Sequence, residues 1–424
     1  GIRDLVRSRG LGDVYKRQKL LALQGSCCKV SGCAGGFMNK KFDIIVYGAT
    51  GFTGSLCAKY LKENYPGLVW GIAGRNQKKL ERLSKKLGLG CKIFIADGDD
   101  LSALNKVTKQ TKVVLTTAGP FHRYGSKLVA SCVANSTHYV DITGENFWVK
   151  QMIEKHHEKA KKKGVRIIPS CGYDSIPSDL GCFFAAKAFG KKIKSIHSFH
   201  TWKGEASGGT IETMFSAKDS GADRSSFGKF ALNPEGSISN KQKEQTSDKV
   251  SVHYNKAVDA WVGPFVMAMA NTRVVRRGAA LLEELGEGYG KDFVYKEHAY
   301  YSSKSAARKT TFFLGVLGVI ILTPLSKLVR PFLKKPGQGP SQAVMDGGFF
   351  KCKFVVNGED GSQKIYKMHA SGDPGYKVTS KLVCESAISL LGDHSLLPGG
   401  ESWGGVLTCL LYTSDAADEG LGVD

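Results

Sequence analysis

The chain has 424 residues, which is enough for two domains with a sizeable core. Its hydrophobic content of 42% is typical of a globular protein, and its 51 glycines follow no period, which excludes a fibrous repeat. The net charge of +22 is compatible with nucleic acid, an anionic membrane surface or a phosphorylated cofactor as partner, but a solvated basic surface explains it most simply. The 11 cysteines form no CxxC pair and no cluster with zinc spacing, so we expect reduced thiols, a cytosol-facing protein and no metal site.

The two ends differ in character from the rest of the chain. Residues 1–37 show no clear period and residues 409–424 follow abruptly on a motif, so we expect both to be non-native, disordered and dispensable for folding. The alternative for the first segment is a basic transit peptide, which Asp4 and Asp13 weaken. The fold is therefore expected to begin at Met38 and to end near Thr408.

The first half alternates short apolar runs with stretches of helical period, which predicts a parallel sheet covered on both faces. The expected strands are 42–47, 68–73, 91–96, 112–117, 138–142 and 165–169. The expected helices are 52–64, 76–87, 100–109, 124–135 and 145–163. This order indicates an α/β fold with a Rossmann-type doubly wound sheet, which we assign to residues 38–184 as a dinucleotide-binding domain.

A glycine-rich loop follows the first expected strand and opens the first expected helix. Gly48 would permit a tight turn, Gly51 would let the backbone approach a pyrophosphate, and Gly54 would let the helix pack close to the strand. The predicted pyrophosphate contacts are Gly48, Ala49, Thr50, Gly51, Phe52, Thr53 and Gly54. The alternative is a glycine turn in a fold that binds no nucleotide.

The end of the second strand predicts which nucleotide binds. NAD sites usually carry an acid there, whereas this chain has Arg75 and Asn76, which favours the 2′-phosphate of NADP(H). Asp97 is predicted to contact the adenine edge, or else to cap the following helix. Ala118, Gly119 and Pro120 end the fourth strand and would let the nicotinamide lie against the backbone.

Residues 185–371 lose this alternation, and we expect them to form an inserted α+β domain for substrate or association. Strands are predicted at 193–202 and on both sides of the turn in 349–370, with a helix opening at 207–210. Residues 372–408 are expected to return as a helix to the first domain. The apolar belt 312–325 is too short to span a bilayer, which leaves a buried core helix or tunnel wall, or an anchor dipping into a membrane or droplet surface. In the anchor reading, basic residues would lie at the headgroups: Lys327, Arg330, Lys334 and Lys335.

Catalytic candidates follow strands four, five and six, because ligands of open α/β sheets bind at the strand carboxyl ends. They are Tyr124, Asp141, Glu145, Tyr173, Asp174 and Ser175. Each also has a structural interpretation, such as packing beneath the nicotinamide for Tyr124 or fixing a turn for Asp174.

Several ordered motifs resemble the saccharopine dehydrogenase-like oxidoreductases, most of all their animal members and more distantly the bacterial trans-acting enoyl reductases of lipid synthesis. The motifs are YGATGFTG (47–54), AGRN (73–76), AGPFHRYG (118–125), THYVDITGE (137–145), GYDSIPSDLG (172–181), SGGT (207–210), PGQGPS (336–341) and GDPGYKVTSKLVCESAISLL (372–391). The resemblance covers 42–408 and does not imply saccharopine as the substrate.

We therefore expect an NADP(H)-dependent oxidoreductase that acts on a lipid-linked carbonyl or enoyl group. It would bind nicotinamide dinucleotide and attach peripherally to the cytosolic face of a membrane or lipid droplet. Two alternatives stay open: a non-catalytic nucleotide-binding adaptor on lipid droplets, and a soluble amino-acid reductase. The sequence predicts no nucleic-acid partner and leaves the oligomeric state open, a homodimer included.

Overall fold

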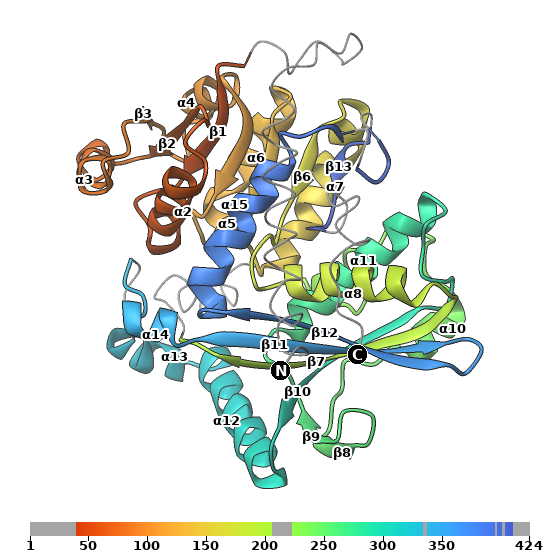
Figure 1. The fold of residues 1–424 in the computed structure, drawn as a ribbon. Coiled ribbons are helices and arrows are strands. Elements are labelled where there is room, and N and C mark those ends of the chain that lie inside the picture. Colours follow the sequence, from red (N-terminus) through yellow and green to blue (C-terminus); the bar gives the residue numbers. More distant parts are fainter. Residues whose placement is uncertain (1–39, 206–222, 334–336, 395–396, 401–402, 410–424) are drawn as a thin grey trace, which may run out of the picture.

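The computed structural model describes residues 40–205, 223–333, 337–394, 397–400 and 403–409. Two sheets lie roughly across each other, with a layer of helices between them (Figure 1). The expected helix at 207–210 lies outside the described residues.

Sheet A is entirely parallel and has the strand order β13-β6-β5-β4-β1-β2-β3. Its strands are β1 (Phe42–Tyr47), β2 (Trp70–Gly74), β3 (Lys92–Ile95), β4 (Thr111–Thr116), β5 (His138–Asp141), β6 (Arg166–Ile168) and β13 (Gly405–Val406). The intervening helices are α2 (Phe52–Asn64), α3 (Gln77–Leu87), α4 (Leu101–Thr108), α5 (Phe121–Tyr124), α6 (Ser126–Ala134) and α7 (Asn146–Lys162). The order reverses at β1, between β2 and β4, which confirms the predicted doubly wound sheet.

Alternation along the strands divides the core of sheet A into two layers. Ile44 and Val46 face α2 and the C-terminal helix, whereas Ile45 and Val114 face α4, α6 and α7. The edge strand β3 differs from the expectation of burial on both faces, because its terminal side chains Lys92 and Ile95 are exposed.

Local sequence explains where several helices and strands of the first domain begin and end. The first strand and first helix have the predicted limits, and Asn76 and Asp100 begin α3 and α4 by accepting the backbone N–H groups of Lys79 and Ala103. The single helix predicted over 124–135 is instead two helices. They meet at Gly125, where a Cβ atom would lie only 2.6 Å from the Trp148 ring, so the chain bends past that ring.

Sheet B has the order β12-β11-β7-β10-β9-β8 and is antiparallel except for the β7–β10 pair. Its strands are β7 (Ile193–Lys203), β8 (His253–Asn255), β9 (Ala260–Gly263), β10 (Val294–Tyr301), β11 (Phe349–Gly358) and β12 (Gln363–Ser371). This confirms the inserted α+β domain, including the strands predicted at 193–202 and within 349–370. The shorter elements of this region are η3 (Arg224–Phe227), α10 (Asn240–Gln245) and α14 (Gln342–Asp346).

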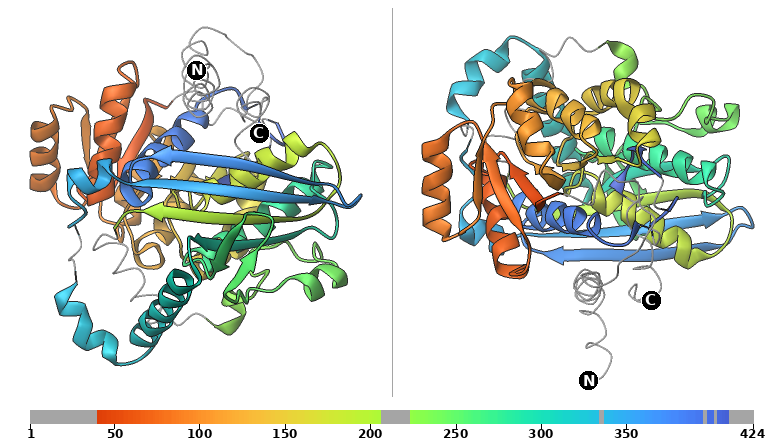
Figure 2. Two further views of the ribbon diagram at one scale, coloured as in Figure 1. Left: turned by 60° about the horizontal axis from the view of Figure 1, so that its bottom comes forward. Right: turned by 90° about the horizontal axis from the view of Figure 1, so that it is seen from above.

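Helices cover the two faces of sheet B unequally. The helices α8 (Ile176–Phe189) and α11 (Ala268–Glu284) fill the space between the two sheets (Figure 1). On the opposite face, α12 (Lys304–Leu322) contacts β9 and β10 and extends away from the sheet, followed by α13 (Leu325–Val329) and η4 (Arg330–Phe332) (Figure 2). No described helix is long and apolar enough to cross a membrane.

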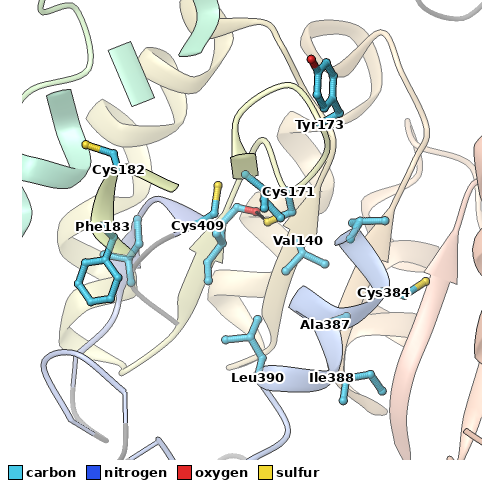
Figure 3. Close-up of a cluster of buried hydrophobic side chains, with 14 of the residues drawn as sticks. Val140, Cys171, Tyr173, Cys182, Phe183, Cys384, Ala387, Ile388, Leu390 and Cys409 are labelled. Atoms are coloured by element: carbon cyan, nitrogen blue, oxygen red, sulfur yellow. Dashed lines mark hydrogen bonds between the residues drawn. The ribbon is translucent and has the colours of Figure 1, made fainter. Parts of the chain in front are cut away.

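The chain then returns to sheet A through η5 (Pro374–Val378) and α15 (Thr379–Ser389). Side chains of α15 join the core against strands of sheet A and their loops. Figure 3 shows Cys384, Ala387 and Ile388 of α15 near Val140 of β5 and Cys171 of the loop after β6. Farther along, β13 pairs with β6, and Cys409, which the sequence assigns to the tail, is fully buried with its thiol 3.6 Å from the Ser170 carbonyl oxygen.

The buried position of α15 predicts that the first domain depends on it. Replacing Ile388, which is buried in the shared core, with Ala should cost about 2–5 kcal/mol of unfolding free energy, because it removes apolar contacts and leaves a cavity. Urea unfolding followed by circular dichroism measures this loss. Leu382→Ala, at a half-buried position of the same helix, is the matched control. An equal loss in both variants would contradict the assignment.

Candidate functional site

The loop after β1 packs closely against the segment that follows β4. Gly48 has φ +79°, and a Cβ atom there would lie 2.9 Å from Ala118 Cβ and 3.0 Å from Ala118 N. Both the left-handed backbone and the close approach therefore require glycine at this position.

The start of α2 is built to receive an anion. A Cβ atom on Gly54 would lie 2.4 Å from the Gly48 carbonyl oxygen and 2.8 Å from Thr117 Oγ1, so only glycine lets the helix sit this close to the loop. Gly51 occupies the N-cap position, where no side chain caps the helix. The backbone N–H groups of the first turn thus remain available to a pyrophosphate, as the helix dipole favours. The residues present fit the dinucleotide that the sequence predicts.

The other loop residues differ in what their side chains do. Ala49 is buried and Thr50 is exposed, while Thr53 is half-buried. The Phe52 ring packs away from the loop, with its centroid 5.3 Å from that of Tyr376 and with Gly339 directly against it. The Phe52 side chain therefore joins the first domain to the C-terminal segment, and only its backbone is placed for the cofactor.

Arg75 and Asp97 lie at one edge of the sheet, at the ends of β2 and β3. Both are exposed, and both charges act on the buried Tyr47 between them. Burial, with Asp97 adding to it and Arg75 opposing it, raises the pKa of Tyr47 to about 12, and its hydroxyl donates to the Ala96 carbonyl oxygen at 3.2 Å. This edge therefore offers a cation and a carboxylate to the adenosine half of a dinucleotide.

Two of the predicted cofactor contacts have structural roles as well. Asn76 caps α3 by accepting the Lys79 N–H at 3.0 Å. Asp97 accepts the Asp99 N–H at 3.0 Å, and Asp100, not Asp97, caps the following helix. The alternative of Asp97 as the helix cap is therefore wrong.

Glu145 fixes the loop that follows Ala118, Gly119 and Pro120. Its buried carboxylate accepts the backbone N–H groups of Phe121 at 2.8 Å and His122 at 2.9 Å, and it contacts His122 Nδ1 at 2.6 Å. Sequence reasoning missed His122, which lies in α5, directly after the Pro120-Phe121 segment that follows β4. Glu145 is thus an anchor of the loop expected to carry the nicotinamide.

The structure separates the catalytic candidates. Tyr124 lies beside the loop after β3, where a Cβ atom on Gly98 would be 3.4 Å from the Tyr124 carbonyl oxygen, and so on the adenosine side. Asp141 is fully buried and accepts from Tyr139 Oη at 2.7 Å and from the Thr143 and Ser170 N–H groups at 2.9 Å. Burial raises the pKa of Asp141 to about 7, but its partners give it a structural role in holding the loops after β5 and β6.

Three candidates remain together after β6. Ser175 is buried and its hydroxyl donates to Asn271 Oδ1 at 3.3 Å. Asp174 is half-buried, and burial raises the pKa of its carboxyl to about 6. Tyr173 is only 8% exposed, and among the described residues its hydroxyl has no hydrogen-bond partner. Burial raises the pKa of Tyr173 well above its usual value, so the hydroxyl stays protonated at neutral pH.

Neighbours from both domains hold Tyr173 in place. Its backbone N–H donates to Thr379 Oγ1 at 2.9 Å, and its ring lies 5.2 Å from that of Phe350 at the start of β11. Its hydroxyl points away from the core cluster below it (Figure 3). Among the described residues, the Tyr173 hydroxyl is therefore a buried donor without an acceptor, in the loop that follows β6.

Comparison with known proteins extends this geometry. Residues 44–168 match the family model described as the saccharopine dehydrogenase NADP binding domain. A Mycobacterium ulcerans (strain Agy99) protein named trans-acting enoyl reductase is 30% identical over 406 residues, covering 89% of this chain and 94% of its own. A Mycobacterium tuberculosis (strain ATCC 25618 / H37Rv) protein, whose name gives the same activity provisionally, is 32% identical over 406 residues. The match covers 90% of this chain and 96% of that protein. The chain belongs to the saccharopine dehydrogenase-like oxidoreductase family.

The solved structure of apo histidine-tagged saccharopine dehydrogenase (L-Glu forming) from Saccharomyces cerevisiae aligns with 12% identity and a TM-score of 0.49 over 90% of this chain and 99% of its own. As a saccharopine dehydrogenase-like oxidoreductase, the chain is an NAD(P)-dependent enzyme, and the matched domain favours NADP(H), as the sequence predicts. That domain runs from β1 to the end of β6, so Tyr173 follows directly after it.

The exposed Arg75 predicts the basis of the cofactor preference. The wild type should bind NADPH more tightly than NADH, and Arg75→Ala should erase most of the difference. A charge-assisted phosphate contact is worth about 1.5–3 kcal/mol, which corresponds to about 10- to 100-fold in affinity. Calorimetric titration with both nucleotides measures this. Arg82→Ala, an exposed arginine on α3, is the control, and equal affinities in the wild type would defeat the prediction.

Proposed function

We propose that this oxidoreductase uses NADPH to reduce an enoyl or carbonyl group on a lipid-linked substrate. The observation that carries the proposal is the buried Tyr173 hydroxyl, which follows β6 of the nucleotide-binding sheet and has no hydrogen-bond partner in the part of the chain that the structure describes. The names of the relatives, which describe enoyl reductases, agree with this reaction. A nicotinamide cofactor supplies the hydride when bound, so the protein must orient the substrate and stabilise its developing negative charge.

Tyr173 is placed for that second task. Hydride addition to the β-carbon of an enoyl thioester moves an electron pair to the carbonyl oxygen. A neutral hydroxyl can donate a hydrogen bond to that oxygen and then give up its proton. The same donor serves reduction of a carbonyl group.

The side chains around Tyr173 favour an acyl group over a charged amino acid. Phe350 packs on its ring, and Phe350 pairs in register with Trp202, whose ring lies 5.1 Å from that of Phe265. These aromatic groups offer apolar surface rather than a counter-ion for a carboxylate. A soluble amino-acid reductase is therefore the weaker alternative.

We expect Tyr173→Phe to lower kcat for NADPH oxidation with an enoyl thioester by about 10²- to 10⁴-fold, because it removes the proton donor. NADPH affinity should stay unchanged, since the cofactor contacts lie on other loops. Tyr289→Phe is the matched control, because the Tyr289 hydroxyl is also buried and has no hydrogen-bond partner among the described residues, but its ring packs on Phe293 and not on Phe350. Assays with enoyl thioesters and with 2-oxo acids plus an amine distinguish the two substrate classes. Wild-type protein that binds NADPH but oxidises it with neither class would support the adaptor.

We further propose attachment to a membrane or droplet surface through α12, α13 and η4. The apolar belt 312–325 is exposed in this chain, which argues against a core helix: Phe312 is 75% exposed, and beyond the belt Phe332 of η4 is 89% exposed. The other exposed apolar side chains of this surface are Phe313, Val316, Val319, Leu325 and Leu328. Exposed lysines and arginines flank it, among them Lys304, Arg308, Lys309 and Lys327, while Lys334 and Lys335 lie outside the described residues. A monotopic anchor with basic residues near anionic headgroups would have this pattern.

Flotation with vesicles tests the attachment. Each exposed phenylalanine buried in a bilayer interface contributes about 1.5 kcal/mol or more, so Phe312→Asp combined with Phe313→Asp should weaken vesicle binding by about 100-fold. Both are better targets than Leu317 and Ile320, which are half-buried and would also disturb the fold. Phosphatidylcholine vesicles with and without phosphatidylserine separate the apolar from the electrostatic contribution.

The control for this experiment is Leu101→Asp, at an exposed apolar residue on the first domain. The melting temperature of each variant is measured on the same sample. Unchanged flotation of the double variant would contradict the anchor. If the double variant instead converts a dimer to a monomer in analytical ultracentrifugation, the same surface pairs two copies of the chain.

A further inference from the structure

Residues 337–341, here named the covering segment, pack on the first residue of α2. A Cβ atom on Gly339 would lie only 2.3 Å from Phe52 Cζ, so this close approach requires glycine. Phe52 directly follows Gly51, the N-cap residue of α2, and the N–H groups of that first turn are the ones available to a pyrophosphate. The covering segment therefore contacts the part of the helix that is expected to hold the cofactor.

Tyr376 of η5 also packs on the Phe52 ring. The two ring centroids are 5.3 Å apart, and the ring planes meet at 81°. Asp373 fixes η5 by accepting the Tyr376 N–H at 3.1 Å, and its own N–H donates to the Met345 carbonyl oxygen of α14 at 2.8 Å. Because α14 starts directly after the covering segment, these contacts join the covering segment, α14, η5 and the start of α2 into one packed unit.

The other end of the covering segment is tied to the proposed attachment surface. η4 ends at Phe332, which is 89% exposed, and Gly337 follows in the sequence five residues later. Five residues reach at most about 18 Å when fully extended. A lipid surface that holds Phe332 would therefore restrict where the covering segment can lie.

The covering segment has few contacts of its own. Gly337 and Gln338 are exposed, Gly339 is half-buried, and Pro340 is buried. Gly337 has φ +91°, a conformation that glycine adopts and leaves at low cost. Segments with little buried surface open at low free energy. Two arrangements of the covering segment are thus accessible, one packed on Phe52 and one released from it.

We infer that a lipid surface at α12, α13 and η4 and NADPH at the loop after β1 strengthen each other's binding through the covering segment. The inference rests on the proposed attachment of this surface to lipid. Lipid favours the packed arrangement because it holds the start of the segment near α2. NADPH favours it because the packing on Phe52 sets the position of the N–H groups that bind the pyrophosphate. Two ligands that favour one arrangement bind cooperatively without touching.

The coupling must be reciprocal, which gives two measurements of one quantity. Phosphatidylcholine vesicles containing phosphatidylserine should tighten NADPH binding, measured by nucleotide fluorescence, by about 5- to 10-fold. Saturating NADPH should strengthen vesicle binding, measured by flotation, by the same factor. Unequal factors would show that the two effects do not share one equilibrium and would overturn the inference.

Gly339→Ala tests the contact on which the coupling depends, because the added Cβ atom displaces the covering segment from the Phe52 ring. In this variant, NADPH affinity should be the same with and without vesicles. Gly315→Ala is the matched control: this exposed glycine of α12 has no atom within 4 Å of an added Cβ atom, so its coupling should equal that of the wild type. Equal coupling in both variants would contradict the inference.

An insertion covers the case in which Gly339→Ala fails to fold. Six Gly and Ser residues added after Leu333 lengthen the link and leave the covering segment unchanged, so the insertion variant should bind each ligand but lose the coupling. Full coupling in this variant would contradict the inference. Wild-type protein that floats with vesicles at unchanged NADPH affinity would overturn the coupling and keep the attachment. Wild-type protein that does not float would reject the attachment, and the coupling with it.

Discussion

The packing of α15 on sheet A is the constraint on which the rest of this structure depends. The chain leaves the first domain after α8 and returns only at η5, yet α15 fills the same face of the sheet as α2 and shares one core with α8 and sheet B. The first domain is thus incomplete until the inserted domain has been made. Because both ends of the insertion are tied to the carboxyl edge of sheet A, sheet B must lie across that edge.

This arrangement creates the candidate site from parts that are distant in sequence. Tyr173 belongs to the loop after β6, but Thr379 of α15 holds its backbone and Phe350 of β11 packs on its ring. Near the glycine loop, Phe52 is covered by Gly339 and Tyr376 in the same way. The returning chain therefore fixes both the nucleotide-binding loop and the proposed proton donor. Packing thus sets the position of the proton donor relative to the loop that would hold the cofactor.

Local patterns were enough to predict the first domain but not the function of its side chains. The limits of β1 and α2, the glycine loop and the cation at Arg75 depend on neighbours in sequence, and the structure has them where the sequence predicts. Asp141 and Tyr124 looked equivalent to Tyr173 because all three lie at or after the carboxyl end of a strand. Only tertiary contacts show that hydrogen bonds within the protein engage the Asp141 carboxylate, and that Tyr124 lies beside the loop after β3. Glu297, His200 and Cys352, which are buried in sheet B, come from three strands paired over long separations, so no sequence spacing could reveal the hydrogen bonds that they make.

Alternation along the strands of sheet B gives its two faces different properties. Tyr295 and Glu297 of β10, with Ser198 and His200 of β7, point toward α8 and α11, where they hydrogen-bond to one another. The residues between them point the other way: the His298 ring stacks on those of His197 and Phe199. That outer face bears α12, which begins three residues after β10 ends. One sheet thus separates a buried polar network, on the face that packs against α8 and α11, from an exposed apolar surface on the other face. Attachment through α12 would leave the carboxyl edge of sheet A and its nucleotide site clear of the lipid.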